Sequence, residues 1–232
     1  MWNGKNKAIT FSFDDGVTQD KRLVEMLDKY GLKATFNINS SILGFPGELQ
    51  LDGKAVRHDK VHASEVKSIY AGHEVAAHTL IHPLLPTLDD EAVVWQVEQD
   101  RKTLSELCGY EVRCMAYPGG GVNNDERVAK LVKEHTGIKL ARTIVSTYNF
   151  DMQTDLIRFN PSVHWCEADK MFELGEKFLA LKADKPQLYY VWGHSYELDG
   201  GTIVWDKFEE FCKIVAHKED IFYGTNSECL FE

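Results

Sequence analysis

Short apolar segments alternate along this chain with segments in which apolar residues recur at helical spacing. Leu23, Leu27 and Tyr30 follow a helical period, whereas the short apolar segments are rich in the β-branched and aromatic residues that strands favour. Strands are expected at 8–13, 34–38, 74–77, 112–116, 139–143, 161–164, 188–192 and 221–223. Because repeated strand-helix units place helices over a parallel sheet, the pattern predicts an α/β fold whose roughly seven units close into an irregular barrel.

Turn and capping residues mark the boundaries between these segments. The longest helix is expected to begin after Thr87, whose hydroxyl can cap it, and to end near Cys108 with Gly109 as the stop. The stretch 40–53 contains Pro46 and several glycines and is expected to be a long surface loop near the site. No linker, internal repeat or low-complexity tract divides the chain, so residues 1–232 are expected to form a single domain.

Two adjacent carboxylates, Asp14 and Asp15, end the first apolar segment and are followed by Gly16. A charge at the end of a buried strand is costly unless it has a partner, and Gly16 lets the backbone turn sharply there. Successive strand residues point to opposite sides, so one carboxylate could bind a metal ion while the other handles a proton. The alternative is that the pair only caps the helix expected at 19–30, since Asp is common at strand-to-helix turns.

Two histidines further along the chain favour the first interpretation. His78 and His82 follow the short strand at 74–77, and Pro83 argues for a compact turn rather than a long helix. Neutral imidazoles and a carboxylate suit zinc or a similar divalent ion. The carboxyl ends of parallel strands share one edge of a barrel, so several polar residues are expected to meet there: Asp14, Asp15, His78, Pro118 and His194.

Charge and composition limit the partners and the compartment. The 232 residues carry a formal net charge of −10 with no basic stripe, which argues against nucleic acid and against an anionic membrane surface as partners. No apolar run approaches the length of a membrane span and no signal-peptide core follows Met1, so a cytoplasmic location is expected. The cysteines have no paired short spacing and are expected to be free thiols: Cys108, Cys114, Cys166, Cys212 and Cys229.

Four short motifs occur in an order that is found in a known family. Two specific ones are Ser12-Phe13-Asp14-Asp15-Gly16 and His78-Thr79-Leu80-Ile81-His82-Pro83. Two looser ones are Met115-Ala116-Tyr117-Pro118-Gly119-Gly120 and Val191-Trp192-Gly193-His194. In these motifs the chain resembles the polysaccharide deacetylases, the carbohydrate esterases of family four that include chitin and peptidoglycan deacetylases. The resemblance implies a distorted (β/α) barrel with about seven parallel strands, and a single catalytic domain over residues 1–232.

The resemblance also implies how the polar residues would act. Asp15, His78 and His82 would bind one divalent metal ion, with zinc expected and cobalt, manganese or nickel as alternatives. Asp14 would be the general base, and His194 the general acid that protonates the leaving amine. The implied reaction is removal of an acetyl or similar small acyl group from an N-acetylated sugar or related carbohydrate.

Four further residues are expected to bind the substrate, which would be a small molecule or an oligosaccharide. They are Tyr117, Pro118, Gly119 and Trp192. Pro118 has no N–H, so the Gly119 amide is the expected donor to the oxyanion. The family has an apolar residue at the place of Trp192, where it lines the acetyl pocket, and the larger indole would narrow that pocket.

The chain departs from the family in two places. Ala116 stands where the third motif normally carries an arginine that orients the base, and Arg142 on a neighbouring strand is the expected replacement. A further motif of the family, which lies between the third motif and the one that contains His194, normally offers an aspartate and a tryptophan, and the segment 140–150 has no such pair. The partner that would tune His194 is not identified from the sequence, and Asp151, Asp155, Asp199 and Asp206 are unranked candidates. No functional role is predicted for His58, His62, His73, His135, His164 and His217.

These departures leave two alternatives beside carbohydrate deacetylation. The first is hydrolysis of a small or cyclic amide on the same scaffold, which the altered motifs and the expected cytoplasmic location make credible. The second is a carbohydrate-binding protein that has lost turnover. Retention of Asp14 together with the three candidate metal ligands disfavours the second alternative.

Overall fold

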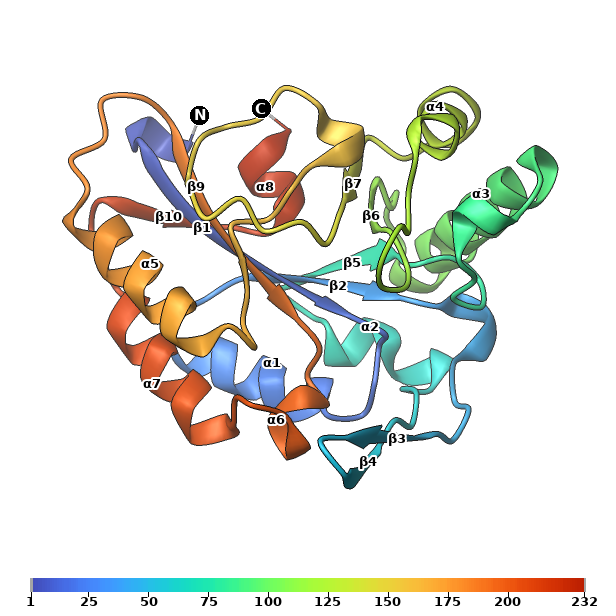
Figure 1. Cartoon of the computed structure of the whole chain (residues 1–232), viewed down its shortest axis with the longest axis horizontal. Helices are drawn as coiled ribbons and strands as arrows, with labels where there is room; N and C mark the ends of the chain where they lie inside the picture. The colour runs from blue at the N-terminus through green and yellow to red at the C-terminus, as the bar shows by residue number, and fades with distance from the viewer. Residues whose placement is uncertain (1, 232) are drawn as a thin grey trace.

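The computed structural model describes residues 2–231, most of which surround one large sheet (Figure 1). The strands follow the order β7-β6-β5-β2-β1-β9-β8, their pairings are parallel, and β10 joins the start of β1. The predicted α/β fold is confirmed, with seven strands along the main path of the sheet. The strands are β1 (Lys7–Asp14), β2 (Ala34–Ile38), β5 (Glu74–Ala77), β6 (Cys114–Ala116), β7 (Leu140–Arg142), β8 (Val163–His164), β9 (Gln187–Gly193) and β10 (Ile221–Tyr223).

The sheet curls because the segment 159–164 contacts strands near both of its ends. Phe159 forms a parallel bridge with Arg142 of β7, and its backbone N–H donates to the carbonyl of Ala141. Five residues later, β8 pairs with β9. The two ends of the sheet are thereby linked by one stretch of chain, which produces the distorted barrel.

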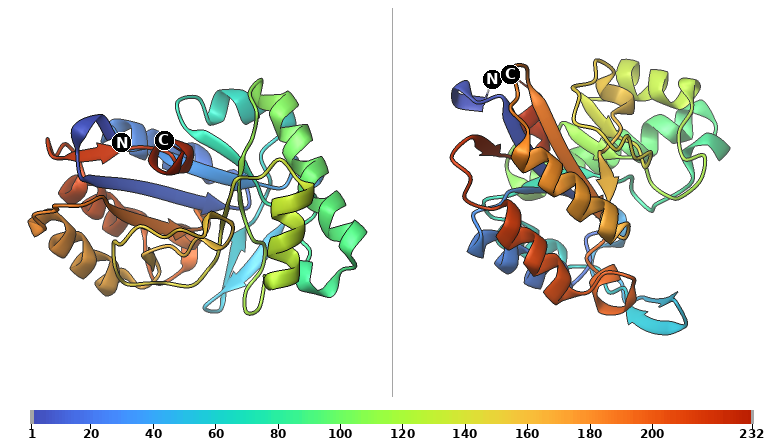
Figure 2. Two further views of the ribbon diagram at one scale, coloured as in Figure 1. Left: turned by 90° about the horizontal axis from the view of Figure 1, so that it is seen from above. Right: turned by 60° about the vertical axis from the view of Figure 1, so that its left-hand side comes forward.

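Helices cover the outer face of the sheet, and a short C-terminal helix lies on its inner face (Figures 1 and 2). Trp2, Cys229 and Leu230 belong to the apolar cluster of the inner face. None of the helices within residues 2–231 combines the length and the apolar character that a membrane crossing requires. The helices are α1 (Asp20–Lys29), α2 (Val66–Ile69), α3 (Asp90–Cys108), α4 (Glu126–His135), α5 (Ala168–Ala180), α6 (Glu197–Gly200), α7 (Trp205–Val215) and α8 (Asn226–Leu230).

Side chains alternate between the two faces of each strand, and the site residues lie on the face that points into the barrel. In β1, Phe11 packs in the larger cluster beneath the outer helices, whereas Ala8 belongs to the inner cluster. A period of two therefore puts Asp14 on the inner side with Ala8. Trp192 of β9 also belongs to the inner cluster, and the guanidinium of Arg142 lies 4.3 Å from the centre of its ring.

The prediction of a long surface loop at 40–53 is wrong. Ser40–Ile42 forms a 3-10 turn, and β3 (Glu48–Leu51) pairs antiparallel with β4 (Lys54–Arg57) in a hairpin that projects from the body of the molecule (Figure 2). Asp52 and Gly53 make the turn of this hairpin with φ of 49° and 79°. Asp-Gly is a dipeptide that two-residue hairpin turns favour, so the sequence did carry a signal for this element.

The start of the longest helix also differs from the prediction. Asp89 caps α3 by accepting a hydrogen bond of 2.8 Å from the backbone N–H of Ala92. Thr87 lies instead in the 3-10 turn Leu85–Thr87 that precedes the helix. The predicted end is confirmed, because Gly109 closes α3 with a φ of 78°.

Candidate metal and catalytic site

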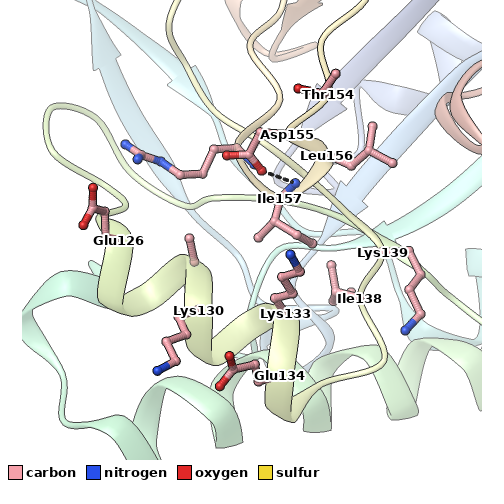
Figure 3. A pocket seen from close by; sticks show the side chains of 12 residues that line it. Glu126, Lys130, Lys133, Glu134, Ile138, Lys139, Thr154, Asp155, Leu156 and Ile157 are labelled. Atoms are coloured by element: carbon pink, nitrogen blue, oxygen red, sulfur yellow. Dashed lines mark hydrogen bonds between the residues drawn. The ribbon is translucent and has the colours of Figure 1, made fainter.

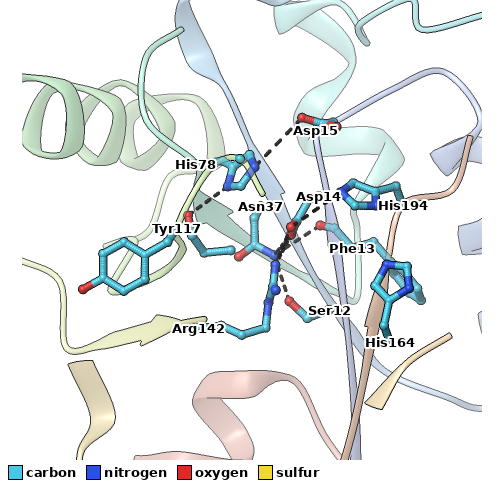
Figure 4. A network of polar contacts seen from close by, with 12 residues as sticks. Ser12, Phe13, Asp14, Asp15, Asn37, His78, Tyr117, Arg142, His164 and His194 are labelled. Atoms are coloured by element: carbon cyan, nitrogen blue, oxygen red, sulfur yellow. Dashed lines mark hydrogen bonds and ion pairs between the residues drawn. The ribbon is translucent and has the colours of Figure 1, made fainter. Parts of the chain in front are cut away.

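The carboxyl ends of β1, β5, β7 and β9 meet at one edge of the barrel, where the predicted site residues gather (Figure 4). A cavity of about 270 Å³ opens at this edge, and we call it the site cavity. Its lining includes Asp14, Asp15, His78, His82, Gly119, Trp192 and His194. The structure thus brings together residues from all four motifs.

Three potential metal ligands converge on the site cavity. The Oδ1 atom of Asp15 lies 3.9 Å from Nε2 of His78 and 3.6 Å from Nε2 of His82. Nδ1 of His78 is 2.8 Å from the carbonyl oxygen of Ala116, which assigns the proton to that nitrogen and leaves a lone pair on Nε2. One carboxylate and two imidazoles at these separations form a donor set that suits zinc and keeps positions open for water and substrate.

Burial keeps one of these imidazoles neutral. His78 is 1% exposed, and its removal from water lowers its pKa to about 4. The neighbouring carboxylates Asp14 and Asp15 raise the pKa of His78, but by less than burial lowers it. His78 is therefore unprotonated at neutral pH, which is the form that binds a metal ion.

The segment 58–61, which follows the hairpin, holds the turn that carries Asp15. Nε2 of His58 lies 3.3 Å from Oδ2 of Asp15, and the ammonium of Lys60 donates to the Asp15 backbone carbonyl at 2.7 Å. The N–H of Val61 donates to the carbonyl of Gly16 at 3.0 Å. Asp15 itself has a φ of 82°, in the left-handed region that Asp tolerates better than most residues. His58, for which we predicted no role, thus occupies Oδ2 and leaves Oδ1 to face the two imidazoles.

Arg142 contacts the second carboxylate, Asp14. Its Nη2 atom donates to both oxygens of Asp14, and both side chains are buried. Ala116 and Arg142 are register partners on adjacent strands, so the guanidinium starts one strand away from the position where the resembled family carries its arginine. Burial alone would raise the pKa of Asp14, but Arg142, then His78 and His194, bring it below its usual value.

Replacing Arg142 by Met should move the acidic limb of the pH–rate profile to higher pH. The guanidinium favours the ionised form of Asp14, and Met removes the charge while keeping an extended side chain. The base would then be protonated at pH values where the wild-type base is ionised, and we expect a shift of about one pH unit or more. Arg113→Met removes an exposed arginine beside β6 and serves as the control. An acidic limb that stays in place would contradict this role for Arg142.

His194 follows β9 and lies on the other side of Asp14. Its Nε2 atom is 4.0 Å from Oδ2 of Asp14, and its Nδ1 atom is 3.2 Å from Oε1 of Glu197. Oε2 of Glu197 accepts hydrogen bonds from the indole of Trp165 at 2.5 Å and from the His194 backbone N–H at 3.0 Å. Burial alone would lower the pKa of His194, but Glu197, followed by Asp15 and Asp14, raises it to about 9. His194 therefore holds a proton at neutral pH.

The partner of His194, which the sequence left unidentified, is Glu197 and none of the four candidate aspartates. The carboxylate of Asp199 instead accepts hydrogen bonds from Gln19 and Trp205. Asp151 pairs with Lys185 at the surface. The remaining two candidates are Asp155, which caps a 3-10 turn, and Asp206, in the first turn of α7. A carboxylate three residues after His194, within a helical turn, is the sequence signal that would have identified Glu197.

His164 and Cys166 lie on the far side of Glu197. Nε2 of His164 is 3.6 Å from Oε1 of Glu197, and the three groups are close enough to suggest a second metal site. However, the backbone N–H of Cys166 donates to Nδ1 of His164 at 3.2 Å, which assigns the proton to Nε2. Burial also raises the pKa of the Cys166 thiol to about 12. These groups therefore support the Glu197 carboxylate, and His164 gains a role at the site that we did not predict.

The four predicted substrate-binding residues are used in different ways. Tyr117, Gly119 and Trp192 line the site cavity, and within residues 2–231 the Gly119 N–H has no hydrogen-bond acceptor. The ring of Tyr117 points away from the other site residues (Figure 4), and its hydroxyl donates to the carbonyl of Ile157 at 2.9 Å. Pro118 is buried outside the cavity lining. The Gly119 N–H is thus without a partner among the described residues, whereas the Tyr117 hydroxyl is occupied within the fold.

A larger cavity of about 880 Å³ lies between α4 and the segment 154–158 (Figure 3). Its charged lining includes Lys130, Lys133 and Lys139, and it shares no lining residue with the site cavity. Cavity size therefore does not identify the functional site. The site cavity is the candidate functional site because three potential metal ligands converge there with the buried Asp14–Arg142 pair and His194.

Known proteins resemble this chain in sequence. The family model described as polysaccharide deacetylase matches residues 3–138. The chain is 27% identical over 145 residues to the peptidoglycan-N-acetylglucosamine deacetylase PgdA of Listeria monocytogenes, a match that covers 61% of this chain and 26% of the relative. It is 26% identical over 124 residues to the peptidoglycan-N-acetylmuramic acid deacetylase PdaC of Bacillus subtilis, covering 52% of this chain and 23% of the relative. The matched regions thus span about a quarter of these relatives.

Solved structures share the fold over nearly the whole chain. A family 4 carbohydrate esterase from Streptomyces lividans, in complex with acetate, superposes with a TM-score of 0.58 at 14% identity and covers 95% of this chain and 93% of its own. BA3943, a CE4 family pseudoenzyme from Bacillus anthracis, gives a TM-score of 0.55 at 17% identity and covers 97% of this chain and 66% of its own. With the family model matching more than half of the residues, the chain belongs to the polysaccharide deacetylase family.

Proposed function

We propose that this chain is a metal-dependent hydrolase that removes an acetyl or similarly small acyl group from an N-acetylated sugar. The observation that carries the proposal is the position of the buried Asp14–Arg142 pair between the candidate metal ligands and His194. This arrangement offers an ionised base and a protonated acid on either side of one small cavity. Membership of the family supports carbohydrate as the substrate class.

Asp15, His78 and His82 would hold the divalent ion, which supplies Lewis-acid chemistry that activates water and polarises a carbonyl oxygen. Asp14 accepts the proton of the attacking water, and Arg142 keeps that carboxylate ionised and oriented. The Gly119 N–H donates to the oxyanion as the acyl carbon becomes tetrahedral.

His194 completes the reaction on the other side of the acyl carbon. An amine is a poor leaving group until it is protonated, and His194 carries a proton at neutral pH. Its Nε2 atom lies 4.0 Å from Oδ2 of Asp14, so the proposed proton donor and the proposed proton acceptor lie close together at the same cavity. The Glu197 carboxylate favours the protonated form of the imidazole, so His194 takes up a proton again after each turnover.

The experiment that tests this proposal is product release from a panel of acylated compounds. Purified protein loaded with zinc, cobalt, manganese or nickel would be incubated with N-acetylated and O-acetylated sugars and with cyclic amides, and acetate, formate and ammonia would be measured. Metal-dependent acetate release from an acetylated sugar is expected. Release of only formate or ammonia, or opening of the ring of a cyclic amide, would support the amide-hydrolase alternative. Binding of sugar with no product from any compound would support a non-catalytic protein.

Small substrates should be turned over with a higher kcat/KM than long oligomers. The site cavity of about 270 Å³ is small, and the hairpin of β3 and β4 projects beside it. We expect N-acetylated monosaccharides and short oligosaccharides to exceed chitin oligomers of about five or more units, because an obstructed groove gains nothing from additional rings. A kcat/KM that rises steadily with oligomer length would overturn this prediction and indicate an open groove with several subsites.

A further inference from the structure

Three neighbouring loops at the site edge contain no charged residue. They follow β5, β6 and β7, which lie side by side in the sheet. Their residues are 79–88, 117–124 and 143–150, and none of these is Asp, Glu, Lys or Arg, although the four types make up 27% of the chain. Surface loops normally carry a share of the charge, so its absence from three adjacent loops sets this border of the site apart.

Each of these loops also lines the site cavity. His82 comes from the first loop, Gly119 from the second and Ile144 from the third. Leu84 of the first loop packs against the second, because a Cβ atom added at Gly119 would lie 3.3 Å from Cδ1 of Leu84. The second and third loops share the lining of a further cavity of about 550 Å³. The three loops therefore form one border of the site.

Four aliphatic side chains project from this border into solvent, and we call them the apolar rim. They are Val122, Val145, Ile81 and Leu84, which are 75%, 58%, 55% and 39% exposed. One exposed apolar side chain is common, but several around a functional cavity mark a binding surface. The third loop also exposes Tyr148, whose hydroxyl donates to Glu167 at the start of α5. The apolar rim itself offers hydrocarbon surface and no aromatic ring for a sugar to stack on.

Hydrogen bonds within the loops hold the apolar rim in place. The Asn123 amide donates to the carbonyls of Tyr117 and Gly119 at 3.1 and 2.9 Å. The backbone N–H of Val145 donates to the hydroxyl of Thr143 at 3.2 Å. None of these bonds uses a side chain of the apolar rim. The backbone of the loops should therefore persist when a rim residue is replaced.

The size of the site cavity leaves part of a substrate outside it. At about 270 Å³ it is smaller than the roughly 300–1,000 Å³ that is usual for small-molecule sites. A group that is attached to the sugar and passes over the three loops would lie on the apolar rim. The hydroxyl groups of a further sugar would find no hydrogen-bond partner on these four side chains, whereas a hydrocarbon chain would lose only its contact with water.

We propose that the apolar rim binds the hydrocarbon chain of a substrate in which the acylated sugar is joined to an aliphatic group. The inference rests on the proposed function, and it narrows the substrate class to conjugates of a sugar with a lipid. Each methylene group that the rim removes fully from water tightens binding by up to about fourfold.

Binding can be measured without turnover in the zinc-loaded Asp14→Asn variant. Octyl and methyl N-acetyl-β-glucosaminide would be titrated by calorimetry below the concentration at which the octyl glycoside forms micelles. We expect the octyl glycoside to bind at least about tenfold more tightly, because its chain adds seven methylene groups. The double substitution Val122→Ser and Val145→Ser should weaken binding of the octyl glycoside at least about fivefold more than binding of the methyl glycoside.

Val204→Ser is the matched control. It makes the same chemical change at a valine that is 51% exposed and precedes α7, outside the three loops. The advantage of the octyl glycoside should persist in this variant. Equal binding of the two glycosides, or an octyl advantage that the double substitution leaves intact, would overturn the proposal. Rim-dependent binding to phosphatidylcholine vesicles, or rim-dependent dimerisation, without an octyl advantage would also overturn it, in favour of a lipid surface or a second copy of the chain.

The kinetics of the wild type separate this proposal from the proposed reaction. If the enzyme releases acetate, the octyl glycoside should have a lower KM than the methyl glycoside with kcat within about twofold, as expected for uniform binding. Acetate release with the same KM for both glycosides would reject the role of the apolar rim and leave the reaction intact. Rim-dependent binding of the octyl glycoside without acetate release would support the rim and reject the reaction.

Discussion

Asp14→Asn is expected to lower kcat by about 10²–10⁴-fold while the protein keeps its metal ion. An amide has nearly the shape of the carboxylate but cannot accept the proton of the attacking water. Arg142 and Asn37 contact Asp14 and do not belong to the candidate ligand set, so the metal ligands should stay in place. Metal content by elemental analysis and kcat on an acetylated sugar, measured on the same preparation, check this expectation.

Asp15→Asn is the matched variant, and it should lose the metal ion first. Asn tolerates the left-handed backbone at this position, so the turn can persist while the ligand charge is removed. Chelation of the wild-type protein should reproduce the loss of activity, and added zinc should restore the chelated wild type but not Asp14→Asn. If Asp14→Asn and Asp15→Asn both retain metal and turn over at the wild-type rate, neither role survives.

Glu197→Gln should move the alkaline limb of the pH–rate profile to lower pH. Glu197 is the largest of the influences that raise the pKa of His194 to about 9 against the effect of burial. Without the negative charge of Glu197, the His194 imidazole loses its proton at lower pH. The protonated acid is then absent in a pH range where the wild type is still active. We expect a displacement of at least about one pH unit, which makes the rate at least about fivefold lower near pH 9.

Two further variants distinguish this effect from a general disturbance of α6. Asp199→Asn removes a carboxylate two residues away whose partners are Gln19 and Trp205, and the alkaline limb should stay in place. Glu197→Asp keeps the charge and should retain most of the elevated pKa of His194. An alkaline limb that is the same in Glu197→Gln and in the wild type would show that Glu197 does not tune His194.

The sequence predicts the strands, their parallel arrangement and the edge at which the site forms, because these depend on local patterns. Asp14, Asp15 and His78 directly follow or end strands, so their common edge follows from the architecture alone. Arg142 could be proposed as the replacement for the missing arginine because its strand is next to the strand that carries Ala116. The structure brings the Arg142 guanidinium to Asp14. The roles of these residues in catalysis remain predictions.

The residues that sequence reasoning missed depend on contacts between distant segments. His58 and Lys60 reach Asp15 across 43 and 45 positions of the chain, and no periodicity links them to it. His164 lies beside Glu197 because β8 pairs with β9, a short pairing with a weak sequence signal. The β3–β4 hairpin and Glu197 are different, since an Asp-Gly turn and a carboxylate three residues after a histidine were both visible in the sequence.

The left-handed backbone at Asp15 restricts which residues can replace this candidate metal ligand in relatives of the chain. Only Gly, Asn and Asp enter that conformation readily, at a saving of roughly 1–2 kcal/mol over other residues, and of these three only Asp supplies a carboxylate. Divergence that abandons metal binding but preserves the fold would therefore pass through Asn or Gly at this position, whereas a change to Ala or Ser carries a cost in folding as well. In a protein descended from this architecture, Asn or Gly at this position would indicate that the fold was retained after metal binding was lost.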